Sequence, residues 1–103
     1  RVTAAAQGDF VIALYNPRSR TRTWQLPEVR SILLEHRSGE TPVGLVADAY
    51  RPTQRVILTD LQHLAEYYDD VDMVTTVVIG NSTTYLHQGQ MVTPRGYEEK
   101  ARR

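Results

Sequence analysis

The sequence has 103 residues, of which 41% are hydrophobic and 23% are charged, the composition of one globular domain and not of a disordered chain. Its 12 basic and 12 acidic side chains cancel, which argues against a nucleic-acid-binding domain, because such domains are visibly basic. There is no cysteine, so disulfides and zinc–thiolate sites are excluded, and a reducing, cytoplasmic location is expected.

The N-terminus shows neither a membrane anchor nor a secretory signal. No apolar run reaches the roughly 18–20 residues that a membrane-spanning helix needs, so no membrane partner is expected. The chain begins at Arg1, without methionine, and runs into a strand pattern within its first ten residues. We interpret this start as that of a domain from a longer polypeptide, with N-terminal processing as the alternative.

The first half of the chain alternates between strand and helix patterns. A short, nearly continuous apolar run at 10–16 predicts a strand that is buried on both faces. Apolar residues at helical spacing predict a helix near 24–37, with Pro27 tolerated near its start. Further apolar runs predict strands at 42–48 and 54–58.

The second half continues this alternation. Thr59-Asp-Leu-Gln62 has the form of a capping box, in which side chains satisfy free N–H groups, and predicts a helix near 60–68. A β-branched run predicts a strand at 74–80, and the residues 83–93 fit either one strand or a hairpin that turns at Gly89. Strands alternating with helices indicate the α/β class.

No metal site is predicted from the sequence. Its three histidines lie far apart and are interpreted as ordinary surface or core-edge residues: His36, His63 and His87. The acidic cluster lacks the spacing and the closing glutamate of an EF-hand, and is interpreted as a solvated turn: Asp69, Asp70 and Asp72.

Other familiar motifs are also missing, and no catalytic residue is predicted. The six glycines form neither a dinucleotide-binding fingerprint nor a P-loop, and no nucleophile elbow or catalytic triad can be written. Asn81-Ser82-Thr83 spells a glycosylation acceptor, which we interpret as coincidence because no secretory signal precedes it. From spacing alone, the sequence indicates an α/β domain and no activity.

Three stretches carry a family resemblance that spans nearly the whole chain. They are Phe10–Ser19; Thr41–Ala49 with Gln54-Arg55-Val56 after it; and Asp72–Ser82 followed by Met91–Tyr97. In this order they resemble the second domain of the C17-methyltransferases in the tetrapyrrole (corrin) methylase family. Leu-Tyr-Asn-Pro-Arg and Thr-Pro-Arg-Gly-Tyr favour these enzymes over their sister corrin methylases.

The resemblance implies a fold and an activity. The fold has two α/β domains with S-adenosyl-L-methionine (SAM) in the cleft between them. Residues 1–103 would be the C-terminal domain, with a mixed, mostly parallel five-stranded sheet flanked by helices. The N-terminal domain, with the glycine-rich SAM loop, is missing from this chain. The complete enzyme would methylate C17 of the tetrapyrrole precorrin-3B, with ring contraction, in cobalamin biosynthesis. It would be a homodimer, and the isolated domain would be inactive.

The resemblance also implies site residues. A SAM contact follows the first strand and falls on Asn16, and a second contact follows the next strand and falls on Ala49, with Tyr15 and Asp48 as neighbours. Arg18 is a candidate for binding the carboxylates of the substrate, since arginine suits such groups. The alternatives are that Asn16 forms a turn, that Ala49 is a packing position, and that the arginine lies in a solvated turn.

Two other functions stay open at this point: a non-enzymatic binding or oligomerisation module, and a domain of a sister corrin methyltransferase. A glycine-rich loop upstream in the parent reading frame would favour the enzyme, whereas a start codon directly before Arg1 would favour the module. The sequence does not distinguish the oxygen-dependent from the oxygen-independent pathway, and so leaves open whether the substrate already contains cobalt.

Overall fold

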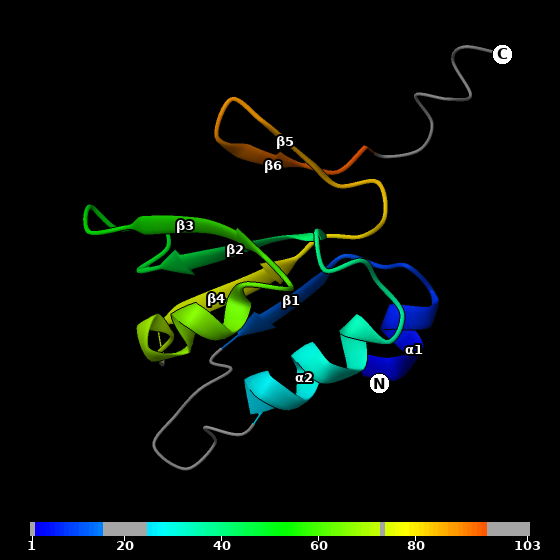
Figure 1. Ribbon diagram of the computed structural model, residues 1–103. Coiled ribbons are helices and arrows are strands. Elements are labelled where there is room, and N and C mark those ends of the chain that lie inside the picture. The colour runs from blue at the N-terminus through cyan, green and yellow to red at the C-terminus, as the bar shows by residue number, and fades with distance from the viewer. Residues whose placement is uncertain (1, 16–24, 73, 95–103) are drawn as a thin grey trace, which may run out of the picture.

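A computed structural model describes residues 2–15, 25–72 and 74–94 of the chain (Figure 1). No helix among these residues is both long and apolar enough to cross a membrane. In chain order the elements are α1 (Val2–Gln7), β1 (Ile12–Tyr15), α2 (Gln25–Leu34), β2 (Pro42–Ala47), β3 (Arg55–Asp60), the 3₁₀ helix η1 (Leu64–Asp70), β4 (Thr75–Ile79), β5 (Tyr85–His87) and β6 (Gln90–Val92).

Four of the described strands form one sheet in the order β1-β4-β2-β3, and every neighbouring pair is antiparallel. The α/β class is confirmed, but the expectation of a mostly parallel, five-stranded sheet is wrong. The link between β2 and β3 spans only residues 48–54, which is too short for the crossover of about a dozen residues that parallel neighbours need. β1 and β2 do run in the same direction, but β4 lies between them.

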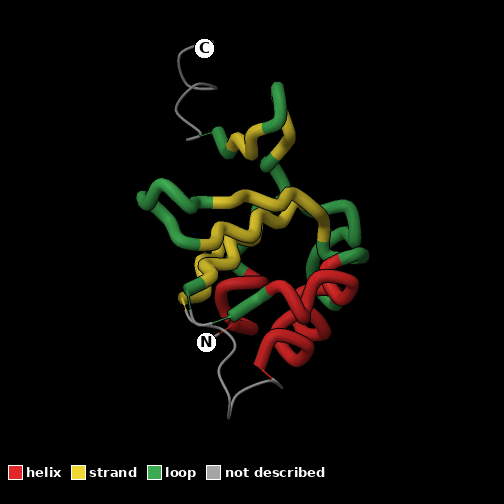
Figure 2. Tube along the Cα trace, turned by 90° about the vertical axis from the view of Figure 1, so that its left-hand side faces the viewer, coloured by secondary structure: helices red, strands yellow, loops and turns green. Residues whose placement is uncertain are grey.

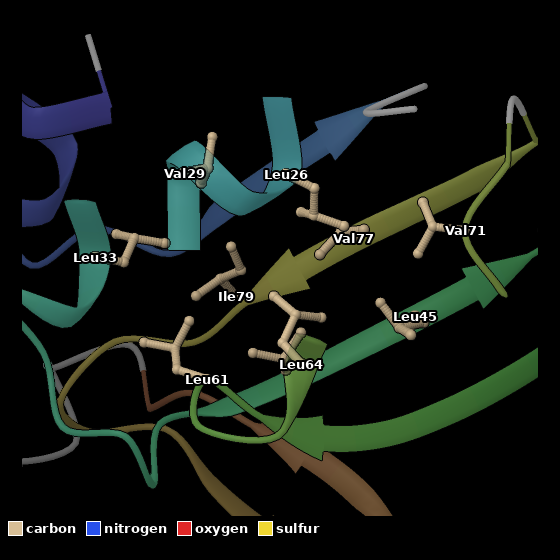
Figure 3. Packing of buried hydrophobic residues seen from close by; sticks show 10 residues of the cluster. Leu26, Val29, Leu33, Leu45, Leu61, Leu64, Val71, Val77 and Ile79 are labelled. Carbon is tan, nitrogen blue, oxygen red and sulfur yellow. The ribbon is translucent and has the colours of Figure 1, made fainter. Parts of the chain in front are cut away.

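The hydrophobic core lies between one face of this sheet and the helices (Figure 3). Leu26, Val29 and Leu33 recur at helical spacing along α2, so they share the side that faces the sheet. Val77 and Ile79 alternate along β4 and point to the same face. These five side chains are at most 4% exposed, and burial of each stabilises the fold by about 1.5–3 kcal/mol. The other fully buried members of the core are Val43, Leu45, Leu61, Leu64 and Val71.

The opposite face of the sheet carries no described helix, and the β5–β6 hairpin lies over it (Figure 2). The sulfur of Met91 in β6 comes within 3.1 Å of the place that a Cβ on Gly44 would occupy, so the hairpin contacts β2 there. Because of this arrangement the first strand is buried on one face only. Ile12 and Leu14 pack against the core, whereas Tyr15 is 75% exposed, so the predicted burial of both faces is wrong.

The predicted helix near 60–68 is a 3₁₀ helix that starts later, at Leu64. Thr59 and Asp60 continue β3, so the capping box does not form. The Asp60 carboxylate accepts a hydrogen bond of 2.8 Å from the backbone N–H of His63 and so closes the turn that leads into η1. The predicted helix near 24–37 is confirmed as α2, which ends at Leu34.

The two ends of the described chain hold short elements. Residues 83–93 form a hairpin, one of the two predicted alternatives, because Gln88 and Gly89 adopt left-handed backbone angles of 51° and 75° that suit a tight turn between twisted strands. Helix α1, Val2–Gln7, has no counterpart among the predicted elements.

Candidate cofactor-binding edge

The ends of β1 and β2 meet at one end of the sheet, on the left in Figure 1. Tyr15, the last residue of β1, pairs with Thr76, and Thr76 pairs on its other side with Val46 of β2. One strand therefore separates Tyr15 from the end of β2, a distance of about 10 Å across two strand spacings. The sheet thus brings together two of the segments on which the sequence placed the cofactor contacts.

Only part of the predicted site lies within the described residues. Asn16 and Arg18 lie outside them, so the geometry of these two side chains is not described. Tyr15 points to the helix-free face and is 75% exposed. Asp48 and Ala49 directly follow β2, and both are half-buried.

The turn that holds Asp48 and Ala49 is closed by several hydrogen bonds. The backbone N–H of Asp48 donates to the carbonyl of Val74, at 3.2 Å, and this bond ties the turn to the start of β4. The Thr53 hydroxyl donates to Oδ2 of Asp48 at 3.0 Å, and the N–H of Arg51 donates to the Asp48 carbonyl at 3.1 Å. Ala49 therefore sits on a fixed backbone, and its small side chain permits close approach of a ligand.

Asp48 adopts a left-handed backbone with φ of 51°, a conformation that aspartate tolerates better than most residues. Tyr50 adopts the same conformation with φ of 66°, although its side chain is bulky. The Tyr50 side chain is fully exposed, and its backbone N–H donates to the side-chain oxygen of Gln54 at 2.8 Å. The sequence analysis did not predict the left-handed backbone of Tyr50. No local signal indicates it, because tyrosine is not a residue that favours left-handed turns.

The groups with displaced pKa values lie in other connections of the fold. Hydrogen bonds from the hydroxyl and then the backbone N–H of Ser82 hold the pKa of Asp9 below its ordinary value. Burial acts to raise the pKa of Asp60, but the hydrogen bonds from His63 outweigh this effect and lower it. Burial raises the pKa of Tyr68. The hydrogen bonds at Asp9 and Asp60 fix loops of the fold.

A polar cavity of about 340 Å³ lies at the other end of the sheet, where β2 starts and β4 ends. Asp9 and Ser82 line it together with Arg37, whose guanidinium donates to the carbonyls of Phe10 and Gly80. These contacts join the segments before β1 and after β4 and so brace the fold. Neither Tyr15, Asp48 nor Ala49 lines this cavity, so the cofactor edge is a separate feature.

The histidines lie on the surface, as interpreted, but the acidic cluster does not form a simple turn, because Asp69 and Asp70 belong to η1. The three histidines and the three aspartates of the cluster are exposed. Among the described residues, no group of three or more potential ligands is arranged to hold a metal ion. Asn81 has a local role, because its side-chain carbonyl accepts hydrogen bonds from the backbone N–H and the hydroxyl of Thr83 at 2.9 and 2.7 Å.

Two curated relatives match almost the whole chain but are much longer. The cobalt-factor III methyltransferase of Priestia megaterium is 50% identical over 100 residues, which are 97% of this chain and 18% of that protein. A protein of Salmonella typhimurium, named probable cobalt-factor III C(17)-methyltransferase, is 44% identical over 97 residues, 94% of this chain and 39% of that protein. The chain therefore spans well under half the length of either relative. No family model matches the chain.

Solved structures share the fold, and two of them illustrate the match. The methyltransferase CobJ matches with a TM-score of 0.82 and 32% identity, over 91% of this chain and 38% of that chain. The uroporphyrin-III C-methyl transferase from Thermus thermophilus, solved in complex with S-adenyl homocysteine, matches with a TM-score of 0.52 and 20% identity, over 68% and 29%. The second match supports the fold alone. By sequence and by fold, the chain is homologous to one part of the longer proteins that are named cobalt-factor III C17-methyltransferases.

Proposed function

We propose that this chain is the C-terminal domain of a longer SAM-dependent methyltransferase that acts on C17 of a precorrin-3B-type tetrapyrrole in cobalamin biosynthesis, with ring contraction. The observation that carries the proposal is the coverage: the two relatives described above match 97% and 94% of this chain, which spans only 18% and 39% of their own length. On its own, the chain would supply one wall of a cofactor cleft and would be inactive.

The edge formed by the ends of β1 and β2 has features that fit SAM. Ala49 has a small side chain, and the hydrogen bonds of Asp48 to Val74 and Thr53 hold its backbone in place. Tyr15 presents an exposed ring one strand away. Ligands of open sheets commonly bind beyond strand ends, where backbone groups can read a base edge. We assign cofactor contacts to Ala49, Asp48 and Tyr15, and keep Asn16 and Arg18 as expectations for the cofactor and the substrate.

Methyl transfer from SAM would not need an acid, a base or a nucleophile from this domain. When bound, SAM supplies a methyl group on a sulfonium, which is already a good leaving group. The residues at the edge need only fix the cofactor and exclude alternative poses, since correct orientation is worth about 7–11 kcal/mol of a transfer barrier. A site made of an alanine, a tyrosine and turn backbone is consistent with this role.

The expected partners follow from the same proposal. They are the preceding domain, the tetrapyrrole and a second copy of the protein in a cytoplasmic homodimer. An apolar groove of about 380 Å³ between the helix-free face and the hairpin supports a protein partner, because Val46, Val56 and Leu58 line it and Val56 is 52% exposed. The neutral charge of the chain gives no support to a nucleic-acid partner.

The test is to express the parent protein with and without its first domain and to titrate both with SAM by calorimetry. The intact protein is expected to bind SAM and to yield a product methylated at C17, located by NMR after incubation with the tetrapyrrole. Methylation at another carbon would indicate a sister corrin methylase. A parent without SAM binding would favour the non-enzymatic module.

A further inference from the structure

Tyr50 has a strained backbone and a side chain that is exposed to solvent. Its backbone is left-handed, with φ of 66°, which is strained for a residue with a bulky side chain. Its side chain is 101% exposed, so no packing within the described residues compensates for that strain. A glycine in this position would form the same turn without strain.

The turn does not need the tyrosine ring. The backbone N–H of Tyr50 donates to the side-chain oxygen of Gln54, and the N–H of Gln54 donates to the carbonyl of Arg51 at 2.9 Å. The Thr53 hydroxyl binds the carboxylate of Asp48. These bonds involve backbone groups and short side chains, so the ring contributes nothing to the turn that would explain its presence.

The ring stands next to the proposed cofactor edge. Tyr50 follows Ala49 directly, in the turn that joins β2 to β3 at the left-hand end of the sheet in Figure 1. Tyr15, the other exposed tyrosine at this end of the sheet, lies at the end of β1. Two exposed tyrosines therefore lie at the end of the sheet that also holds Ala49.

We propose that Tyr50 is a positioning residue whose ring stacks on a flat conjugated part of the ligand bound at this edge. Two parts of the proposed ligands have this chemistry, the adenine of SAM and the conjugated segments of the tetrapyrrole. Aromatic rings bind such surfaces by offset stacking, which tolerates variation in the partner but fixes its plane. The inference rests on the proposed function and adds to it a residue that the family resemblance did not supply.

Because the Tyr50 backbone is strained, one substitution is expected to raise the stability of the protein while it weakens ligand binding. In the intact parent protein, Tyr50→Gly removes the ring and relieves the left-handed strain at once. We expect the melting temperature to rise by about 1–4 °C, because small gains in stability shift it by that order in a protein of roughly 150–250 residues. We expect ligand binding to weaken at the same time by about fivefold or more, the ratio that one stacked base contributes. A residue with a merely structural role would move both measurements in the same direction.

Two further variants serve as controls. Tyr50→Phe keeps the ring and the strain, and is expected to keep both the affinity and the melting temperature. Gln88→Gly relieves a similar left-handed backbone, with φ of 51°, at an exposed position in the β5–β6 turn. It is expected to raise the melting temperature without any change in binding.

Two titrations distinguish the two ligands. S-adenosylhomocysteine reports on the adenine, and the tetrapyrrole substrate reports on the conjugated ring system. A loss of affinity for either one in Tyr50→Gly, with Tyr50→Phe normal, supports the proposal and identifies the stacked partner. Unchanged affinity for both overturns it while leaving the proposed function intact. Failure of the unsubstituted parent protein to bind either ligand overturns the proposed function, and this inference with it.

Discussion

Asp9 accepts hydrogen bonds from both the backbone N–H and the hydroxyl of Ser82, which lies 73 residues further along the chain. Asp9 itself has a left-handed backbone, with φ of 57°, which orients its carboxylate toward the turn after β4. Arg37 lies close enough to add a favourable charge interaction to this carboxylate. The segment before β1 is thus fixed to the segment after β4 by hydrogen bonds between residues far apart in the sequence.

This contact predicts a pH dependence. The Ser82 hydroxyl holds the pKa of Asp9 below its ordinary value, so the folded state favours the ionised carboxylate. The resulting stability is present above the ordinary pKa of an aspartate, about 3.9, and is lost as the pH falls through the lower pKa of the folded state. Ser82→Ala is expected to raise the pKa of Asp9 toward its ordinary value, as followed by NMR titration of the side-chain carboxyl carbon. Identical midpoints in the two proteins would contradict this assignment.

Glycine substitutions within β2 and directly after β4 are predicted to lower the free energy of unfolding by different amounts. A Cβ on Gly80 would lie 2.6 Å from the Cβ and the hydroxyl oxygen of Thr84, whose buried side chain is hydrogen-bonded to Thr93. We expect Gly80→Ala to destabilise the fold by about 1–3 kcal/mol, as overpacking does. In Gly44→Ala the new methyl would lie 3.1 Å from the sulfur of the flexible Met91 side chain and in ordinary contact with Leu58 at 3.7 Å, so the change should be smaller. Urea unfolding of both variants tests this order, and equal costs would contradict it.

Truncation of a buried core side chain is predicted to lower the free energy of unfolding more than truncation of an exposed one. Leu33 on α2 is 0% exposed and packs in the layer between the helices and the sheet. Leu33→Ala is expected to lower the free energy of unfolding by about 2–5 kcal/mol, because it leaves a cavity that the core cannot fill. Leu86 in the hairpin is 52% exposed, and Leu86→Ala should change that free energy by no more than about 0.5 kcal/mol. A similar loss in both variants would show that the hairpin belongs to the cooperative core.

The sequence predicted which segments form strands but not how the strands pair. The runs at β2 and β4 are apolar and β-branched, so their type could be derived from composition and period alone. Strand direction depends on the turn at residues 48–54. Its hydrogen bonds, from Thr53 to Asp48 and from the Tyr50 N–H to Gln54, have no recognisable turn signature in the sequence. The resemblance placed Ala49 after the second strand, and Ala49 lies two residues beyond the end of β2; its role as a cofactor contact stays a prediction.

The wrong capping box and the unpredicted Tyr50 conformation also result from contacts beyond the local sequence. Thr59 satisfies a capping pattern locally, yet its pairing with Val43 keeps it in β3, because the ladder of β2 and β3 extends through Asp60. Tyr50 could not be predicted as left-handed, since its conformation is imposed by the closure of the whole turn. Local patterns identify the elements, while pairing across the sheet decides where they end.

The assignment of Ala49 can be tested in the intact parent protein. Ala49→Leu places a branched side chain where the cofactor is proposed to approach, and is expected to weaken SAM binding at least about tenfold, equivalent to 1.4 kcal/mol. The melting temperature should change little, because Ala49 is only half-buried. Ala65→Leu, at an exposed position of η1, is the matched control and should leave binding unchanged. Wild-type affinity in Ala49→Leu would remove Ala49 from the site.

The isolated chain of 103 residues is predicted to bind SAM only weakly and to transfer no methyl group. A micromolar cofactor site corresponds to about −8 kcal/mol, and loss of half of the contacts leaves about −4 kcal/mol, a dissociation constant in the millimolar range. Catalysis should suffer more than binding, because one wall cannot fix the cofactor relative to the substrate, and the orientation term is worth about 7–11 kcal/mol when complete. Incubation of the purified chain with isotopically labelled SAM and the tetrapyrrole measures this directly, after circular dichroism has verified that the chain is folded. Product formation at a rate near that of the intact protein would mean that the active site lies within these residues and that the proposed half-cleft is wrong.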